Sequence, residues 1–197
     1  MALEHNLSRE QIREKYNIPN DAFVVSYVGR HNHVKGYDLL QKAAEEVWRK
    51  EPNVYFLIAG KEFPIRGLRD KKWIEVGWTN IPGNIVNASD VFVLPNRRTF
   101  FDLILLEVMS IGKPIIASFT GGNKFVSRQT NGIITFEKEN IADLVKKILD
   151  LSLLSRDELE RLGLENKILY NNYYTPEKFA LRYRKEVGRL FFGEIQK

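Results

Sequence analysis

Short apolar runs rich in β-branched and aromatic residues recur along the chain, and each is bounded by glycine, proline or polar residues. Runs of this length and composition predict buried β-strands. Between them, apolar residues recur at three- and four-residue spacing, as in residues 39–48 behind Gly36, which predicts helices that pack one face onto a sheet. The strands are expected at residues 22–28, 54–60, 73–77, 90–95, 113–118 and 131–136.

The order of these elements predicts the fold class. A strand, a glycine loop, a helix and a second strand over residues 22–60 form a βαβ unit, whose strands are parallel and whose connection is right-handed. The runs are apolar almost throughout, so both faces of the sheet should be covered. We therefore expect an α/β fold, a doubly wound parallel sheet of about six strands.

Helices are expected at both ends of the chain. A polar helix opens it, and the last third is helical. The expected helix starts are Asn140, Ser155 with a capping box to Glu158, and Thr175 with Pro176 in the first turn.

The composition is that of an ordinary folded domain. The 197 residues are 44% hydrophobic and 28% charged, and no stretch rich in Pro, Gly or Ser marks a linker, so residues 1–197 should form one domain. The absence of cysteine excludes disulfides, Cys-based zinc sites and thiol nucleophiles. The N-terminus has no apolar signal core, and the longest apolar run, LILLEVMSI, is too short to span a bilayer. Secretion and membrane crossing are therefore not expected.

The net charge is +5, from 30 Lys and Arg against 25 Asp and Glu. This balance allows an anionic ligand or an anionic membrane surface without requiring either. Basic residues are mixed with acidic ones, as in RDKKWIE and RYRKEVGR, whereas nucleic-acid binders typically show a stripe of one sign. Solvated surface charge is the favoured interpretation, and no nucleic-acid partner is expected.

Ligands of open parallel sheets bind outside the carboxyl ends of the strands. The segment after the first strand, GRHNHVKG, places Gly29, Arg30 and Lys35 at the mouth of a helix, which suits a phosphate or diphosphate. The loop is neither a GxGxxG fingerprint nor a Walker loop, and a charged loop at such a place is more often only solvated. Both interpretations stay open on this segment alone.

No metal site is expected. His31 and His33 lie close in sequence, but no carboxylate or third histidine accompanies them, and His5 lies in the N-terminal tail. A protein metal site usually needs three or four ligands, so the pair alone is insufficient.

The segment after the fourth strand contains a helix at residues 103–111 that is apolar on nearly all sides and should be buried. Glu107 lies in its middle, and a buried carboxylate costs several kcal/mol unless it has partners. Glu107 either pairs with a lysine or caps a loop, or it accepts hydrogen bonds from ligand hydroxyls such as a ribose diol. Asp102 is expected to cap the helix, with the free N–H groups of the first turn facing the same cleft as Arg30 and Lys35.

Two glycines, Gly121 and Gly122, follow the fifth predicted strand. Glycines at this place permit close approach of the backbone to a ligand. The alternative is a plain tight turn.

The motifs occur in a recognisable order: GR-x4-KG, the strand DVFVLP, F-x6-E-V-M-x2-G-x-P-I-I-A-S, and T-G-G. This set resembles the C-terminal, nucleotide-sugar-binding domain of retaining GT-B glycosyltransferases, and more narrowly glycosyltransferase family four, the group 1 transferases. The resemblance runs from REKYNIPNDAFVV to TPEKFALRYRKEV. It implies a Rossmann-like domain and an N-terminal acceptor domain that has no counterpart in these residues.

The resemblance also implies roles for single residues. Arg30 and Lys35 would bind the donor diphosphate and stabilise its departure, with no metal cofactor, and Glu107 would hold the donor ribose. The donor would be a UDP- or GDP-sugar. Contacts to sugar, phosphates and base are implied for Phe101, Asp102, Leu103, Gly77 and Trp78.

The chain departs from the family pattern at three places. Thr99 stands where the first glutamate of the Glu-x7-Glu motif is expected. Asp102 replaces the second residue of the usual FG-L, and the glutamate that usually follows the double glycine is absent from GGNKFV. Asp102 offers a carboxylate by another route.

The expected function is retaining transfer of a sugar from a nucleotide diphosphate sugar, in assembly of a surface polysaccharide or glycolipid. The expected place is the cytoplasm, with peripheral contact of the full-length protein at the inner face of the membrane. Alternatives are a GT-B epimerase or glycogen-type phosphorylase, and a non-catalytic sugar-nucleotide-binding module, which the replacement at Thr99 motivates. A dehydrogenase is disfavoured because no GxGxxG follows the first strand.

Overall fold

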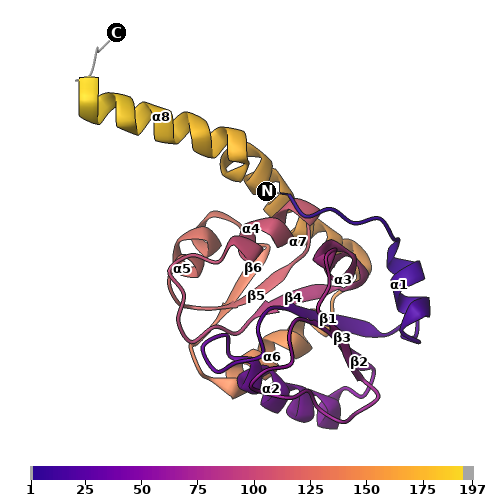
Figure 1. Cartoon of the computed structure of the whole chain (residues 1–197). Helices are drawn as coiled ribbons and strands as arrows, with labels where there is room; N and C mark the ends of the chain where they lie inside the picture. Colours follow the sequence, from indigo (N-terminus) through magenta and orange to yellow (C-terminus); the bar gives the residue numbers. More distant parts are fainter. Residues whose placement is uncertain (1, 193–197) are drawn as a thin grey trace.

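Six parallel strands form one sheet in the order β3-β2-β1-β4-β5-β6 in the computed structural model, which describes residues 2–192 (Figure 1). The expected doubly wound sheet is confirmed, and each strand end lies within two residues of its expected place. The strands are β1 (Phe23–Val28), β2 (Val54–Ala59), β3 (Trp73–Gly77), β4 (Val91–Leu94), β5 (Ile115–Ser118) and β6 (Ile133–Phe136).

Helices connect the strands, and their caps lie where the sequence predicts them. Asn140 accepts a hydrogen bond from the Asp143 backbone N–H at 3.0 Å, and Ser155 forms a reciprocal capping box with Glu158. The Thr175 hydroxyl accepts from the backbone N–H two residues into the last helix. The helices are α1 (Arg9–Lys15), α2 (Tyr37–Lys50), α3 (Pro82–Ala88), α4 (Leu103–Ile111), α5 (Asn123–Val126), α6 (Ile141–Ser152), α7 (Arg156–Leu169) and α8 (Pro176–Phe192), with a short turn η1 (Ser127–Gln129) and a π-helical turn η2 (Tyr170–Tyr174).

The two faces of the sheet are covered by different helices. Along β4, Val91 and Val93 pack into the core under α2 and α6, while Phe92 and Leu94 pack into the core under α4. This alternation follows from the two-residue period of a strand. Figure 1 shows α2 and α6 on one side of the sheet and α3, α4 and α7 on the other. Apolar burial on both faces explains why the strand sequences are continuous apolar runs.

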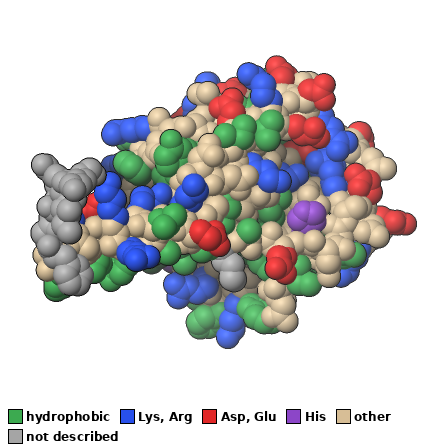
Figure 2. All heavy atoms as spheres, turned by 90° about the horizontal axis from the view of Figure 1, so that it is seen from above, with side chains coloured by type: hydrophobic (Ala, Val, Ile, Leu, Met, Phe, Trp, Pro, Cys, Tyr) green, Lys and Arg blue, Asp and Glu red, His purple; other side chains and the backbone are tan. Residues whose placement is uncertain are grey.

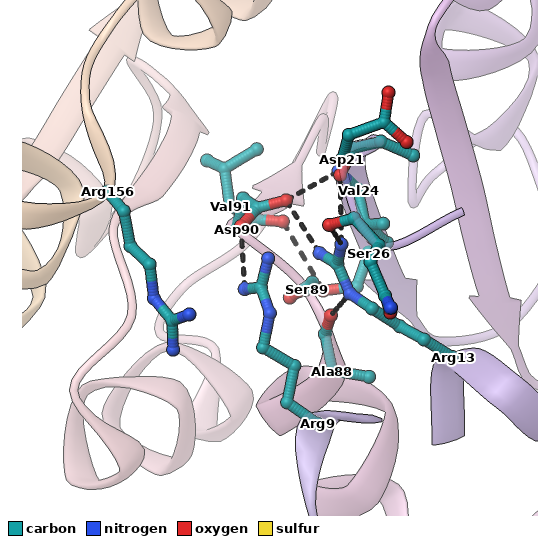
Figure 3. Close-up of polar contacts among 12 residues, drawn as sticks. Arg9, Arg13, Asp21, Val24, Ser26, Ala88, Ser89, Asp90, Val91 and Arg156 are labelled. Atoms are coloured by element: carbon teal, nitrogen blue, oxygen red, sulfur yellow. Dashed lines mark hydrogen bonds and ion pairs between the residues drawn. The ribbon is translucent and has the colours of Figure 1, made fainter. Parts of the chain in front are cut away.

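A buried ion pair fastens α1 to the amino ends of the strands (Figure 3). Arg13 is 1% exposed, donates to Asp90 at 2.8 Å, and also donates to the backbone oxygens of Ala88 and Ala22. Asp90 additionally accepts from Arg9 at 2.7 Å and from the Val24 backbone N–H at 2.7 Å. The network ties α1, β1 and β4 together at the end of the sheet opposite to the loops considered below.

The last helix extends away from the sheet (Figure 1). Within the described residues α8 packs mainly against η2, and hydrophobic and basic side chains lie side by side along it (Figure 2). Phe179, Tyr183 and Leu190 are each more than half exposed. Within residues 2–192, no helix combines the length and hydropathy that a membrane crossing requires.

Candidate functional site

The order of the strands reverses between β1 and β4, and the loops that are predicted to bind a ligand follow these two strands. β1 continues to β2 and β3 on one side, whereas β4 continues to β5 and β6 on the other. Connections at such a point diverge, which leaves a crevice at the carboxyl ends of the two strands. The loop of residues 29–36 follows β1 and the loop of residues 95–102 follows β4.

Lys35 and Asp102 join these two loops directly. The Lys35 ammonium donates to the Asp102 carboxylate at 2.5 Å, and the Asn96 side-chain amide donates to the other carboxylate oxygen. Asp102 has a side chain that is 9% exposed, so burial strengthens the attraction between the two charges. Lys35, for which the family resemblance implies a diphosphate contact, is therefore paired with a carboxylate.

Asp102 lies at the predicted N-cap position of α4, but the prediction that its side chain caps the helix is wrong. Asp102 occupies the N-cap position, and its backbone oxygen accepts from the Leu105 N–H at 3.1 Å, but its side chain makes no capping bond. The carboxylate turns to Lys35 because a full positive charge attracts it more than a backbone N–H does. The first N–H groups of α4 are consequently left without a side-chain cap.

Arg30 is exposed in the same loop as Lys35, two residues after the end of β1. Its backbone oxygen accepts from the Tyr27 hydroxyl at 2.8 Å, and in the described part of the chain its guanidinium makes no ion pair. Glycine is needed at Gly29, because a Cβ there would lie 2.9 Å from the Tyr27 hydroxyl oxygen. Arg30 is thus held by its backbone while its charge stays available.

Helix α4 is less buried than its composition predicts. Leu105, Val108 and Met109 pack into the core, but Leu103 is 71% exposed. The helix lies in the outer layer, where α3, α7 and η2 pack against it and its first residue stays exposed. Hydrophobic residues all around a helix do not reveal which neighbour covers the remaining side, which is why full burial was the wrong prediction.

Glu107 lies half-buried on α4 beside a hollow of about 440 Å³. Burial raises the pKa of its carboxyl. Among residues 2–192 no lysine or arginine forms an ion pair with it, so the structural interpretation of Glu107 as half of a buried pair has no partner here. The hollow is lined by Ala2, Leu3, Glu4, His5, Asn6, Asn80, Ile81 and Pro82 together with Glu107.

Gly77 is the last residue of β3 and Trp78 follows it, at the same end of the sheet. Gly77 has a φ of 78°, which favours glycine, and no heavy atom lies within 4 Å of the place of a Cβ. The Trp78 side chain is 73% exposed. The backbone therefore turns sharply here, and an aromatic side chain is presented to solvent near the start of α3.

The two glycines after β5 approach protein rather than open space. A Cβ on Gly121 would lie 2.0 Å from the Thr99 backbone oxygen, and one on Gly122 would lie 2.4 Å from the Phe101 ring. The Gly122 N–H donates to the Phe100 oxygen at 2.8 Å. The glycine pair holds the loop of residues 99–101 in place, a role that neither sequence interpretation included.

Sequence reasoning missed a buried polar cluster under the first loop. His31 is fully buried and stacks on the Tyr37 ring at 4.0 Å between centroids. Glu75 accepts from the Tyr37 hydroxyl and from the Trp73 indole N–H at 2.7 Å, and lies 3.8 Å from the His31 ring nitrogen. The one available signal was Glu75 itself, a carboxylate inside the strand WIEVG. The described residues contain no group of three or more His, Asp or Glu side chains placed to hold a metal ion.

Burial lowers the pKa of His31 to about 4, below its ordinary value of 6.5. The folded protein therefore disfavours the charged ring, and stability should fall as the pH drops from 6.5 towards 4 while the unfolded chain takes up the proton. We expect a loss of about 1–2 kcal/mol between pH 7 and pH 5 that His31→Phe removes, measured by urea unfolding. His33→Phe, at a 73% exposed side chain, is the control. Equal pH slopes in the parent and His31→Phe would contradict the expectation.

The six-stranded parallel sheet with helices on both faces defines a Rossmann-like α/β domain. The chain belongs to the group 1 glycosyl transferases, since the model of that family matches residues 22–153. This agrees with the resemblance carried by the motifs.

Several curated relatives are named as glycosyltransferases. The chain is 32% identical over 156 residues to the alpha-D-kanosaminyltransferase of Streptomyces kanamyceticus, covering 72% of this chain and 40% of that protein. It is 25% identical over 189 residues to the O-antigen biosynthesis glycosyltransferase WclY of Escherichia coli, covering 91% and 50%. The chain spans about half the length, or less, of these relatives.

Solved structures share the fold. Sucrose-phosphate synthase from Thermosynechococcus elongatus has a TM-score of 0.75 at 21% identity, covering 98% of this chain and 53% of that one. Anabaena HepE, determined in complex with UDP and glucose, has a TM-score of 0.76 at 14% identity, covering 91% and 51%. Both similarities extend over half of a larger protein.

Proposed function

We propose that this chain is the donor half of a retaining glycosyltransferase, which binds a UDP- or GDP-sugar in the crevice between the loops after β1 and β4. The observation that carries the proposal is the convergence there of Arg30, Lys35 and the N-terminus of α4, which has no side-chain cap. Two cations and free N–H groups suit a diphosphate.

The same groups would serve the chemical step. When the bond between the anomeric carbon and the diphosphate oxygen breaks, the electron pair stays on the oxygen and negative charge grows on the diphosphate. Arg30 and the α4 N–H groups would stabilise that charge, and no metal ion is part of the proposal. Lys35 would exchange its contact with Asp102 for one with the leaving group, or share it.

The nucleoside would lie towards β3. Glu107 borders the hollow beside the start of α3, and its carboxylate would accept hydrogen bonds from the ribose hydroxyls. The Gly77–Trp78 turn would contact the base. With Asp102 turned towards Lys35 and Thr99 in place of a glutamate, the donor sugar would rely on the backbone of residues 101–103.

We further propose that the acceptor half lies outside these residues. The chain covers only about half of its structural relatives, and the apolar side chains of Leu103, Phe179 and Tyr183 are exposed as if another domain covered them. The full-length protein would work in the cytoplasm, with peripheral contact at the inner membrane face, in assembly of a surface polysaccharide or glycolipid. The O-antigen role of one relative supports this setting.

A non-catalytic sugar-nucleotide-binding module is the second candidate. It is favoured by Thr99, where a carboxylate is expected, and by the pairing of Lys35 with Asp102. The deciding experiment incubates the full-length protein with radiolabelled UDP- and GDP-sugars and an extract of acceptors, and determines the anomeric configuration of the product. Transfer with retention supports the enzyme, while nucleotide binding without transfer from any donor supports the module.

Glu107→Gln separates a ribose contact from a structural role. We expect UDP affinity to fall about five- to thirty-fold, or roughly 1–2 kcal/mol, because two hydroxyls lose a charged acceptor. The melting temperature should stay equal or rise slightly, since burial already disfavours the charged carboxyl and no cation loses a partner. Calorimetry and thermal melts measure both, with the exposed Glu14→Gln as control.

If the Glu107→Gln variant is destabilised and its UDP affinity is unaltered, Glu107 has a structural role and does not contact the ribose. The Glu107→Gln variant should bind a nucleotide and its 2',3'-dideoxy form with nearly equal affinity, because the carboxylate that would accept from the two hydroxyls is already replaced.

A further inference from the structure

Arg97, three residues after β4, makes four hydrogen bonds with the loop that carries Lys35 and with the start of α2. Its guanidinium donates to both carboxylate oxygens of Asp38, at 2.6 and 2.8 Å, and to the His33 backbone oxygen at 2.7 Å. Its backbone N–H donates to the Val34 oxygen at 3.0 Å. One residue thus binds the loop of residues 29–36 at two backbone oxygens and at the first turn of α2.

The two residues before Arg97 hold the same loop by other means. Gly36 has a φ of 68°, and a Cβ on it would lie 1.8 Å from the Pro95 backbone oxygen, so the two backbones are in direct contact. Asn96 donates to Asp102, which binds Lys35. Three consecutive residues therefore fix the loop from one side.

The ion pair between Arg97 and Asp38 is largely buried, and each of the two residues has a further charged neighbour. The side chains of Arg97 and Asp38 are 23% and 16% exposed. Burial acts to raise the pKa of Asp38, but the hydrogen bonds and charge of Arg97 outweigh it and hold this pKa below its ordinary value. The His33 imidazole lies 3.2 Å from Asp38, and Glu139, after β6, lies 3.6 Å from Arg97. Bidentate guanidinium–carboxylate pairs of this kind fix geometry as well as contributing energy.

We propose that Arg97 and Asp38 are positioning residues, which hold the Arg30–Lys35 loop in the conformation that receives the donor diphosphate. The inference rests on the proposed function. Arg30, His33 and Val34 are exposed, so without the clasp formed by Arg97 and Asp38 this part of the loop would have fewer contacts that fix its conformation. The contacts of Arg97 hold His33 and Val34, the exposed middle of this loop, so that less ordering remains to be done when a ligand binds. Neither residue touches the nucleoside half of the site in this arrangement, so the effect should be confined to the phosphates.

The test compares UDP and uridine binding to the 197-residue chain with substitutions at Arg97 and Asp38. We expect Arg97→Ala and Asp38→Asn each to weaken UDP binding about ten-fold, and the double variant to be no worse than either single one. Uridine affinity should be unchanged, and Arg97→Lys, which keeps the charge but not the bidentate geometry, should recover part of the loss. Arg98→Ala removes a charge from the exposed neighbouring side chain and is the matched control.

Three outcomes would overturn the proposal. UDP affinity of Arg97→Ala equal to that of Arg98→Ala would show that the clasp does not act on the phosphates. Equal losses for UDP and uridine together with a lower melting temperature would make the pair merely structural. Failure of the parent chain to bind UDP or GDP would remove the proposed function itself, and this inference with it.

Discussion

Replacing Asp90 by asparagine is expected to lower the free energy of unfolding by about 3–5 kcal/mol, the range for breaking a buried ion pair. Asp90 is the carboxylate that compensates Arg13, whose side chain is 1% exposed, and it also binds Arg9. Asparagine offers one neutral oxygen to two guanidinium groups and to the Val24 N–H. Urea unfolding at pH 7 measures the change.

The control is Asp150→Asn, which breaks an exposed pair with Lys146 on α6. Exposed pairs contribute at most about 1 kcal/mol, so this variant should resemble the parent. A domain of ordinary stability has about 5–15 kcal/mol in total, so the Asp90 variant should unfold at clearly lower urea. A loss at Asp90 no greater than at Asp150 would contradict the account of how α1 is fastened.

Arg30→Ala is expected to weaken UDP or GDP binding about ten- to hundred-fold and to leave uridine or guanosine binding nearly unchanged. A charge-assisted hydrogen bond contributes about 1.5–3 kcal/mol, and Arg30 has no competing carboxylate among the described residues. Arg49→Ala, at an exposed position near the C-terminus of α2, is the control. Unaltered affinity for the diphosphate would show that Arg30 is a solvated surface residue with no part in binding.

Lys35→Ala should behave differently from Arg30→Ala. Lys35 already pairs with Asp102, so a diphosphate gains less from it, and the smaller loss of affinity should come with a lower melting temperature because Asp102 is left with Asn96 alone. Isothermal calorimetry beside thermal melts distinguishes the two variants. Equal affinity losses with unchanged melting temperatures would contradict a stabilising pair between Lys35 and Asp102.

The sequence was sufficient for the elements because their signals are local. An apolar run such as residues 54–60 forms a buried strand wherever it is placed in a sheet, and the capping box at Ser155 needs only residues three apart. The expected parallel sheet places the loop of Arg30 and Lys35 at the carboxyl end of the first strand, and ligand binding there stays a prediction.

Side-chain direction inside the loops could not be predicted in the same way. Asp102 turns to Lys35, 67 residues earlier in the chain, and Gly121 packs on Thr99, so each depends on a contact that only the fold creates. The sequence places Arg13 on a polar helix, where a surface position is expected, yet its side chain is buried and pairs with Asp90. His31 reads as half of a histidine pair, but its ring faces the core while His33 faces solvent.

The central claim is that this chain binds the diphosphate and ribose of a nucleotide donor. Calorimetric titration of residues 1–197 with UDP and with GDP tests it most directly. We expect saturable binding of UDP or GDP below millimolar concentration. The affinity should be weaker than in a closed two-domain enzyme, because one side of the ligand stays exposed. No binding of either nucleotide at millimolar concentration would contradict it.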